Sequence, residues 1–257
     1  MRSILTLHLK QVLRENDWIL PALLLLACAV FGQFFAPTND DPTLVYSTRT
    51  QAIWICAWLC SIFWVSFVSA RIGSAQRYYH LRAFWKSLGV RDLEYFGALF
   101  VVPNLLNVAL FLAAAILSVV VGRTPDAPLT EWIAVNLQGV FFAVLAQSII
   151  AAVILGLTNY LNAAPSFACG FLLNLYGLYG IQVVDAARRG NNAGIAAIAD
   201  VFWSIGPHLH FADFISRLTF FWGVLPLRPF LNASMYFTGL LLFSCLVALR
   251  LWKYRSE

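Results

Sequence analysis

Charged residues are scarce in this chain. Asp, Glu, Lys and Arg make up only 11% of its 257 residues, and apolar residues make up 61%. An ordinary soluble domain has about 25% charged and about 45–50% apolar residues. Because the uncharged runs recur along the whole length, no stretch of ordinary composition remains for a separate soluble domain. The composition excludes a soluble globule and predicts a polytopic membrane protein.

Sequence signals of several other protein classes are also missing. The 10 prolines and 15 glycines are ordinary numbers, and no repeat is evident, which excludes a fibrous, disordered or repeat protein. The few lysines follow Leu9, Trp85 and Trp252, so none stands in the Gly-Lys-Ser/Thr context of a phosphate-binding loop. The uncharged runs hold no acidic, basic or histidine side chain with which to build an intramembrane acid–base or metal site.

The apolar runs are long enough to cross a bilayer, which takes about 20 residues as a helix. They predict six spans, at residues 18–36, 51–70, 96–121, 132–157, 166–184 and 229–251. The run from 132 to 184 is too long for one crossing, and Thr, Asn and Pro at residues 158–165 favour a turn there. We expect one all-α transmembrane domain over residues 1–257, with short helices in an outer loop at residues 185–228.

The distribution of Lys and Arg predicts the orientation. With both termini on one side of the membrane, that side carries eleven of the 17 basic residues and the other side carries six. Loops rich in Lys and Arg stay in the cytoplasm. We therefore expect a multi-pass protein of the cell membrane with both termini in the cytoplasm.

The residues before the first predicted span have an amphipathic pattern. Leu5, Leu9 and Val12 recur at helical spacing, which predicts a helix along the cytoplasmic membrane surface. This helix either joins the membrane domain to a partner or is a plain interfacial anchor. Asn16 and Asp17 are expected to cap the first span.

The loop between the second and third predicted spans contains another amphipathic segment. Its apolar residues recur at i, i+3, i+4 and i+7, which is a helical spacing. They are Leu81, Phe84, Trp85 and Leu88. Arg82 and Lys86 lie on the other face, and Gly89 is expected to end the helix. A basic amphipathic helix rests on anionic lipid or binds a protein, and the pattern alone leaves both open.

Two groups of residues could in principle bind a metal, the cysteines and a histidine–aspartate set, and for both the sequence favours a structural role. The cysteines fall inside predicted spans, where we expect them to pack as small apolar residues. Cys56 and Cys60 share a helix face, but two soft ligands without a third make a poor metal site. His208, His210 and Asp213 form a His-x-His-x-x-Asp set, which is a weak candidate for zinc binding against a structural role at the outer membrane face.

A family resemblance connects these segments. Residues 80–97, HLRAFWKSLGVRDLEYFG, look like the loop of ABC-2-type permeases, where a short helix after the second span is followed by a turn, a basic residue and a glycine that opens the third span. Residues 206–214 and the basic tail at residues 249–255 resemble the outer-loop segment and the C-terminal tail of the same family. With the six spans and the N-terminal helix, the resemblance covers essentially the whole chain.

The resemblance implies the membrane subunit of an ATP-driven exporter. The loop helix would couple to a separate ABC ATPase subunit, with Phe84 and Trp85 as anchors and with Arg82 and Lys86 meeting acidic groups of that partner. ATP and magnesium would belong to the ATPase, and neither a cofactor nor nucleic acid is expected on this chain. Six spans are half of the usual twelve-span core, which implies a second permease copy or a paralogue.

Gly170, Asn174 and Gly177 create a flat stripe on the fifth predicted span. Small residues at this spacing let another helix approach closely, and the amide can bond across the contact. We expect the stripe to face protein, supplied either by the same chain or by the second permease.

The cargo is only weakly indicated. Amide side chains in the spans either bridge helices or line a transport path. The absence of charge in the runs favours a lipid-like, glycan-linked or amphipathic cargo over a small ion. The alternatives are a membrane scaffold or assembly subunit without transport and, less favoured, an intramembrane enzyme with a metal site at the outer face. The expected location is the bacterial inner membrane, with membrane lipids around the chain.

Overall fold

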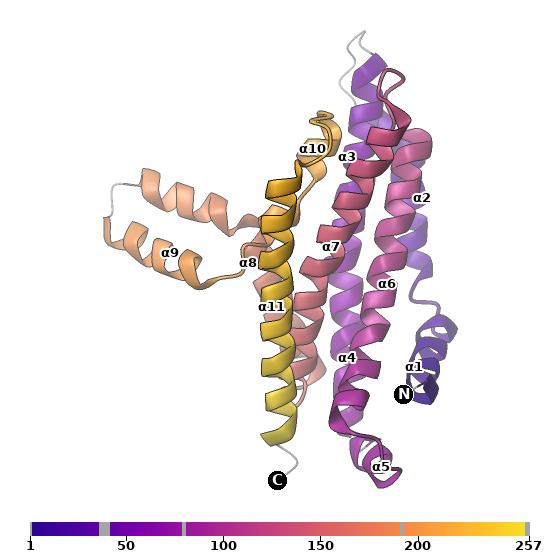
Figure 1. Cartoon of the computed structure of the whole chain (residues 1–257), viewed down its shortest axis with the longest axis vertical. Coiled ribbons are helices and arrows are strands. Elements are labelled where there is room, and N and C mark those ends of the chain that lie inside the picture. Colours follow the sequence, from indigo (N-terminus) through magenta and orange to yellow (C-terminus); the bar gives the residue numbers. More distant parts are fainter. Residues whose placement is uncertain (1, 36–41, 79–80, 191–192, 255–257) are drawn as a thin grey trace.

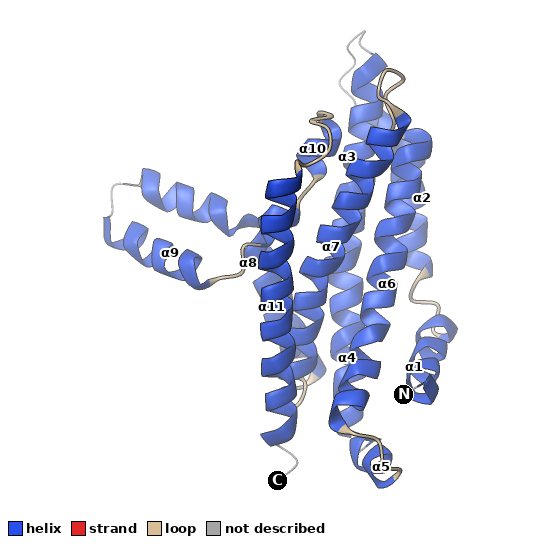
Figure 2. Cartoon of the chain, in the orientation of Figure 1, coloured by secondary structure: helices blue, strands red, loops and turns tan. Residues whose placement is uncertain are grey.

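The computed structural model describes residues 2–35, 42–78, 81–190 and 193–254, and within these ranges it contains helices and no strands (Figure 2). The α-helices are α1 (Arg2–Arg14), α2 (Ile19–Phe31), α3 (Pro42–Cys60), α4 (Ser66–Tyr78), α5 (Leu81–Ser87), α6 (Asp92–Val121), α7 (Leu129–Leu157), α8 (Ala163–Arg189), α9 (Ala193–Ile205), α10 (Ile215–Thr219) and α11 (Leu227–Tyr254). A π-helical turn, Ser61–Val65, joins α3 to α4, and short 3₁₀ helices lie at Gly32–Phe35 and Leu209–Ala212.

Five of the described helices are long and apolar enough to cross a membrane. They are Leu44–Gln76, Asp92–Val121, Leu129–Leu157, Ala163–Arg189 and Leu227–Trp252, and each contains one predicted span. The first predicted span falls on α2 and the following 3₁₀ turn. It reaches the length of a crossing only together with α1, as the pair Ser3–Arg14 and Ile19–Phe34, which is bent by 60°. The chain is therefore an all-helical, membrane-embedded protein with five to six candidate spans.

The crossing helices form a bundle along the long axis of the molecule (Figure 1). α1, α5 and the C-terminal end of α11 lie toward one end of the bundle, whereas α10 and the loop between α6 and α7 lie at the other end. The C-terminal part of α8 leaves the bundle and projects sideways with α9. No residue of α9 is buried, although most of its side chains are apolar.

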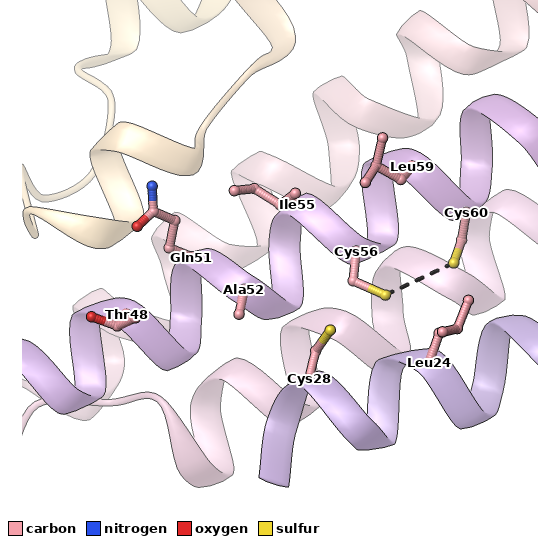
Figure 3. A pocket seen from close by; sticks show the side chains of 9 residues that line it. All are labelled: Leu24, Cys28, Thr48, Gln51, Ala52, Ile55, Cys56, Leu59 and Cys60. Atoms are coloured by element: carbon pink, nitrogen blue, oxygen red, sulfur yellow. Dashed lines mark hydrogen bonds between the residues drawn. The ribbon is translucent and has the colours of Figure 1, made fainter. Parts of the chain in front are cut away.

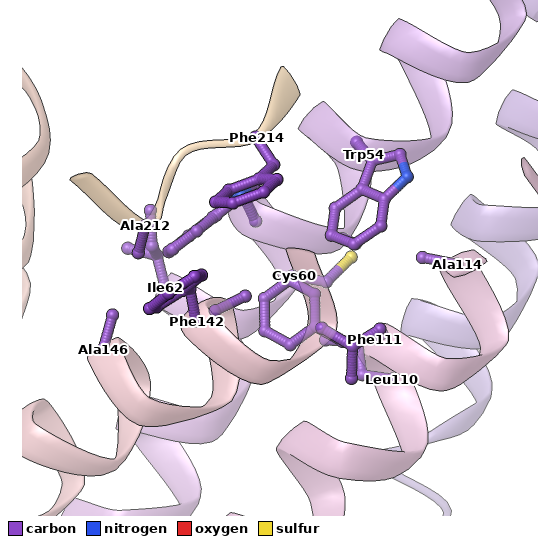
Figure 4. Packing of buried hydrophobic residues seen from close by; sticks show 14 of the residues in the cluster. Trp54, Cys60, Ile62, Leu110, Phe111, Ala114, Phe142, Ala146, Ala212 and Phe214 are labelled. Carbon is purple, nitrogen blue, oxygen red and sulfur yellow. The ribbon is translucent and has the colours of Figure 1, made fainter. Parts of the chain in front are cut away.

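Two apolar clusters hold the bundle together. The first lies between α3, α6, α7 and the segment before α10 (Figure 4), where Trp54 stacks on Phe111 with centroids 6.1 Å apart and Phe142 stacks on Phe214 at 5.4 Å. The second collects side chains from α1, α4, α6, α7 and α11, and Trp252 is almost completely buried in it. This second cluster is the one against which α5 packs, because Trp85 contacts it.

The helices extend beyond the predicted spans. α4 continues to Tyr78, α6 begins at Asp92, and α8 continues to Arg189, five residues into the predicted outer loop. A charged residue ends a hydrophobic run but leaves the i to i−4 hydrogen bonds intact, so helices continue into the headgroup region. Counting apolar residues therefore underestimates the length of these helices.

The predicted cap of the first span is wrong. Trp18 occupies the N-cap position of α2 and makes no side-chain capping bond. Asp17 instead pairs with Arg71 of α4 at 2.7 Å, and Glu15 pairs with the same guanidinium. The acidic residues before α2 therefore fasten the bend between α1 and α2 to another helix, a long-range contact with no local sequence signal.

Candidate functional site

The short helix α5 lies at one end of the bundle, in the connection between α4 and α6 (Figure 1). As the sequence predicts, the helix does not continue past Gly89: its last residue is Ser87, and Gly89 has a φ of 80° that glycine adopts without strain. The Gly89 N–H donates to the carbonyl of Lys86 at 3.0 Å, and the Val90 N–H donates to that of Trp85 at 3.1 Å. These bonds satisfy carbonyls that the end of a helix leaves free.

The apolar residues of α5 do not share one environment. Phe84 and Leu88 are 55% and 60% exposed, whereas Leu81 and Trp85 are half-buried. Trp85 packs against the second apolar cluster and meets Phe84 edge-on at 5.3 Å. Lys86 is exposed. The surface that α5 presents outward is therefore Phe84 and Leu88 with Lys86 beside them, and Trp85 belongs to the interior of this chain.

Arg82 also faces its own chain. Its Nε and Nη2 both donate to one carboxylate oxygen of Asp92, at 3.1 and 2.9 Å, and its Nη1 donates to the backbone carbonyl of Trp252 at 2.6 Å. The guanidinium carbon lies 5.4 Å from the centre of the Trp252 ring. Only 17% of the Arg82 side chain is exposed. The structure thus ties Arg82 to α6 and α11 rather than presenting it to an acidic partner.

The sequence-based prediction missed Trp252, which lies where four helices meet. Its indole N–H donates to the carbonyl of Leu155 on α7 at 3.1 Å. Its ring contacts Tyr95 and Phe96 of α6 at centroid distances of 5.6 and 5.7 Å. Because tryptophan is common at span ends as an interfacial residue, nothing in the sequence distinguishes this one.

Tyr95 extends the same contacts toward the N-terminus. Its hydroxyl donates to the side-chain carbonyl of Gln76 on α4, and the Gln76 amide nitrogen lies 3.3 Å from a ring nitrogen of His8 on α1. All three side chains are buried. The end of the bundle that carries α5 is therefore connected by polar contacts that join α1, α4, α5, α6, α7 and α11.

The predicted stripe on α8 faces the same chain. A Cβ atom at Gly170 would lie 2.3 Å from Ile154 of α7, and one at Gly177 would lie 2.6 Å from Leu209. Asn174 between them is fully buried and exchanges two hydrogen bonds with Gln147 of α7, at 2.9 and 3.2 Å. Within this chain the stripe is already covered, so no second permease is needed to cover it.

His208 and His210 belong to an aromatic cluster. The ring of His208 lies edge-on to Trp203 at 4.5 Å, and that of His210 lies 5.7 Å from His208. Burial and the nearby His208 lower the pKa of His210, while a hydrogen bond with the Gly177 backbone opposes this shift. The Asp213 carboxylate accepts from the Ile215 N–H at 2.9 Å. Among the residues that the structure describes, these side chains do not converge into a set of three metal ligands.

Several amide side chains in the candidate spans connect different segments of the chain. The Ser61 hydroxyl in the π-turn donates to Asn107 of α6 at 2.6 Å, and the Trp54 indole of α3 donates to Asn136 of α7 at 3.2 Å. The side chain of Gln138 exchanges hydrogen bonds with the backbone of Leu225. These contacts satisfy polar groups inside the membrane region and specify which helices meet.

Three cysteines gather in a groove between α2 and α3 (Figure 3). Cys28 of α2 lies with Cys56 and Cys60 of α3 on a cavity of about 510 Å³, and the sulfurs of Cys56 and Cys60 are 3.9 Å apart. Packing is the predicted role, and it fits Cys56 and Cys60, which are buried, but Cys169 is exposed on α8. In the described part of the chain, no group of three His, Cys, Asp or Glu side chains has the geometry of a metal site.

Comparison with protein families, curated proteins and solved structures finds no match for this chain.

Proposed function

We propose that this chain is the membrane-spanning permease subunit of an ATP-driven ABC-2-type exporter, and that α5 is the helix on which a separate ATPase subunit acts. One observation carries the proposal. α5 displays Phe84 and Leu88 outward at one end of a membrane bundle, on a helix held in place by the Gly89 turn and by Arg82. Exposed apolar side chains on a braced loop helix are typical anchors for a protein partner.

The proposed topology has six crossings, the first formed by α2 with the bend from α1. α1, α5 and the end of α11 lie toward the same end of the bundle (Figure 1). The eleven basic residues expected on one side of the membrane belong to these segments and to their sequence neighbours at residues 71–91 and 250–255. The excess of Lys and Arg favours the cytoplasm for this end. α1 would lie along the membrane surface, with Ile4 and Val12 packed on the bundle and Leu7 and Leu13 facing lipid.

A protein partner fits α5 better than lipid alone. Phe84 on α5 and Leu88 directly after it are exposed, while Leu81 and Trp85 are half-buried and Trp85 contacts the second cluster. A helix that only rests on lipid is already held by the flanking spans. A rigid turn and an arginine with three hydrogen bonds would add little to its attachment. A helix that receives a push from a partner needs both, because a loose helix would absorb the motion.

ATP and magnesium belong to the proposed ATPase partner, and a second permease copy or a paralogue completes the membrane core. The proposed cargo is lipid-like, glycan-linked or amphipathic, since the uncharged runs hold no charged side chain with which to conduct a small ion. The proposed location is the bacterial inner membrane with both termini in the cytoplasm.

The test is purification of the intact complex from native membranes, with identification of any co-purifying protein that carries a phosphate-binding loop. The double variant Phe84→Ala/Leu88→Ala should weaken ATPase binding by roughly thirtyfold, because truncation of an interface anchor costs about 2 kcal/mol or more. The matched control is Leu242→Ala/Leu246→Ala, which truncates two comparably exposed side chains on α11. The control should retain the ATPase.

Two results would overturn the proposal. One is the absence of any ATPase in complexes of the wild-type chain. The other is an ATPase that binds the Phe84→Ala/Leu88→Ala variant as tightly as it binds the control variant.

A further inference from the structure

Arg82 occupies an unusual place for a cation on a short loop helix, because it holds the end of a distant helix. The carbonyl groups in the last turn of an α-helix have no partner within the helix, and a cation there is favoured by the helix dipole. Trp252 lies in the last turn of α11, and its carbonyl accepts from Arg82 Nη1 at 2.6 Å. Arg82 therefore caps α11 while Asp92 fixes the orientation of the guanidinium from α6.

Trp252 repeats this arrangement one helix further on. Its indole N–H donates at 3.1 Å to the carbonyl of Leu155, which lies in the last turn of α7. The side chain of Trp252 is 1% exposed and is clamped between α6 and α7. The ends of α5, α11 and α7 are thus joined in series by two contacts to helix-terminal carbonyls.

We propose that Arg82 and Trp252 are the positioning pair that transmits a displacement of α5 to α11 and α7. This inference rests on the proposed function, and it assigns Arg82 to transmission within the permease rather than to binding of the ATPase. The shared contacts make α5, α11 and α7 move together, whereas Phe84 and Leu88 bind the ATPase partner. Binding and transmission are then carried by different side chains, with Phe84 and Arg82 both on α5 and Leu88 directly after it.

The contacts predict which substitutions separate the two roles. Arg82→Gln removes the charge and both the Asp92 and the Trp252 contacts. The charge-swapped variant Arg82→Asp/Asp92→Arg restores an ion pair between α5 and α6, but an aspartate at position 82 has no donor for the Trp252 carbonyl. Trp252→Phe keeps an aromatic ring in the cluster and keeps the carbonyl that Arg82 caps. It loses the contact between α11 and the Leu155 carbonyl, which still accepts from the Thr158 hydroxyl of its own chain segment at 2.7 Å. Arg91→Gln is the matched control, since Arg91 is 79% exposed and pairs only locally with Glu94.

The experiment measures two quantities on the complex reconstituted in lipid vesicles with its co-purifying ATPase and Mg·ATP. These are the affinity of the ATPase for the permease and the increase in ATP hydrolysis that the permease causes. All three variants, Arg82→Gln, the charge swap and Trp252→Phe, should leave the affinity for the ATPase within about twofold of wild type. They should lower the permease-dependent hydrolysis by about tenfold or more, because the loss of a hydrogen bond to a charged or buried group changes an equilibrium constant by roughly tenfold. Arg91→Gln should change neither quantity.

Thermal unfolding of each variant separates transmission from folding. The charge swap should unfold closer to the wild-type temperature than Arg82→Gln does, while remaining as poorly stimulated. If the charge swap regains full stimulation, or if Arg82→Gln and Trp252→Phe keep it, the transmission role is wrong even though the ATPase binds. If no ATPase binds the wild-type permease, the proposed function fails and the transmission role fails with it.

Discussion

Gly177 offers a sharp test of the packing between α8 and the segment that follows α9. A Cβ atom added there would lie 2.6 Å from Leu209 Cγ and 2.8 Å from the backbone oxygen of Pro207. Leu209 is completely buried and cannot rotate away, and the Pro207 oxygen belongs to the backbone. Overpacking of this kind costs about 1–3 kcal/mol, while the better helix propensity of alanine returns up to about 1 kcal/mol. We expect Gly177→Ala to lower the free energy of unfolding by about 1–2 kcal/mol.

The matched control for this variant is Gly239→Ala on α11, where an added Cβ would meet no atom within 4 Å. The control should be neutral or slightly stabilising, because only the helix propensity changes. Thermal unfolding in lipid nanodiscs, followed by tryptophan fluorescence, should place Gly177→Ala roughly 2–8 °C below the control. Equal midpoints for the two variants would refute the packing argument. A loss of oligomer at unchanged midpoint would show that the stripe serves a subunit interface.

Three further predictions follow from contacts in the bundle. Burial lowers the pKa of His210 in the folded state, so at acidic pH the unfolded chain binds more protons than the folded chain. The free energy of unfolding should therefore fall as the pH drops below about 6.5. Unfolding measurements between pH 7 and 5 should show a smaller fall for His210→Gln. Replacing Gln147 with Leu should cost about 1–3 kcal/mol by leaving Asn174 unpaired in the core, and the double variant Gln147→Leu/Asn174→Leu should recover most of that loss in a double-mutant cycle. Asp17→Asn should cost less than about 1 kcal/mol, because Arg71 keeps Glu15, but hydrogen exchange should quicken in the bend between α1 and α2.

The coarse architecture could be predicted because one physical requirement dominates it. A crossing helix must hide its backbone polar groups and present about 20 apolar residues to lipid, and such runs are visible in any sequence. Five of the six predicted spans fall inside helices of sufficient length. The first span is shorter in the structure because α2 ends at Phe31 and is bent away from α1. A hydrophobic count contains no information about such a bend.

The contacts that define the candidate site could not be predicted in the same way. Arg82 and Trp252 are 170 residues apart in the sequence. An arginine on a basic amphipathic helix is usually solvated or bound to lipid, so the local pattern favours the wrong environment. The partner of Arg82 is a backbone carbonyl, which every residue has, and no side-chain pattern marks the one that is used.

The helical spacing on α5 illustrates the limit, and it leads to a last prediction. At 100° per residue, Leu81 and Trp85 lie on one flank of the apolar stripe and Phe84 and Leu88 on the other, so a single stripe serves two neighbours. The sequence sets the width of the stripe but does not say what covers each flank.

Since Trp85 packs into the second cluster, Leu81→Ala/Trp85→Ala should lower the free energy of unfolding of the isolated chain by about 2–4 kcal/mol. Phe84→Ala/Leu88→Ala should stay within about 0.5 kcal/mol of wild type, because both side chains are exposed. Thermal unfolding without any partner measures both variants, and equal losses would mean that the two flanks are not divided between this chain and a partner.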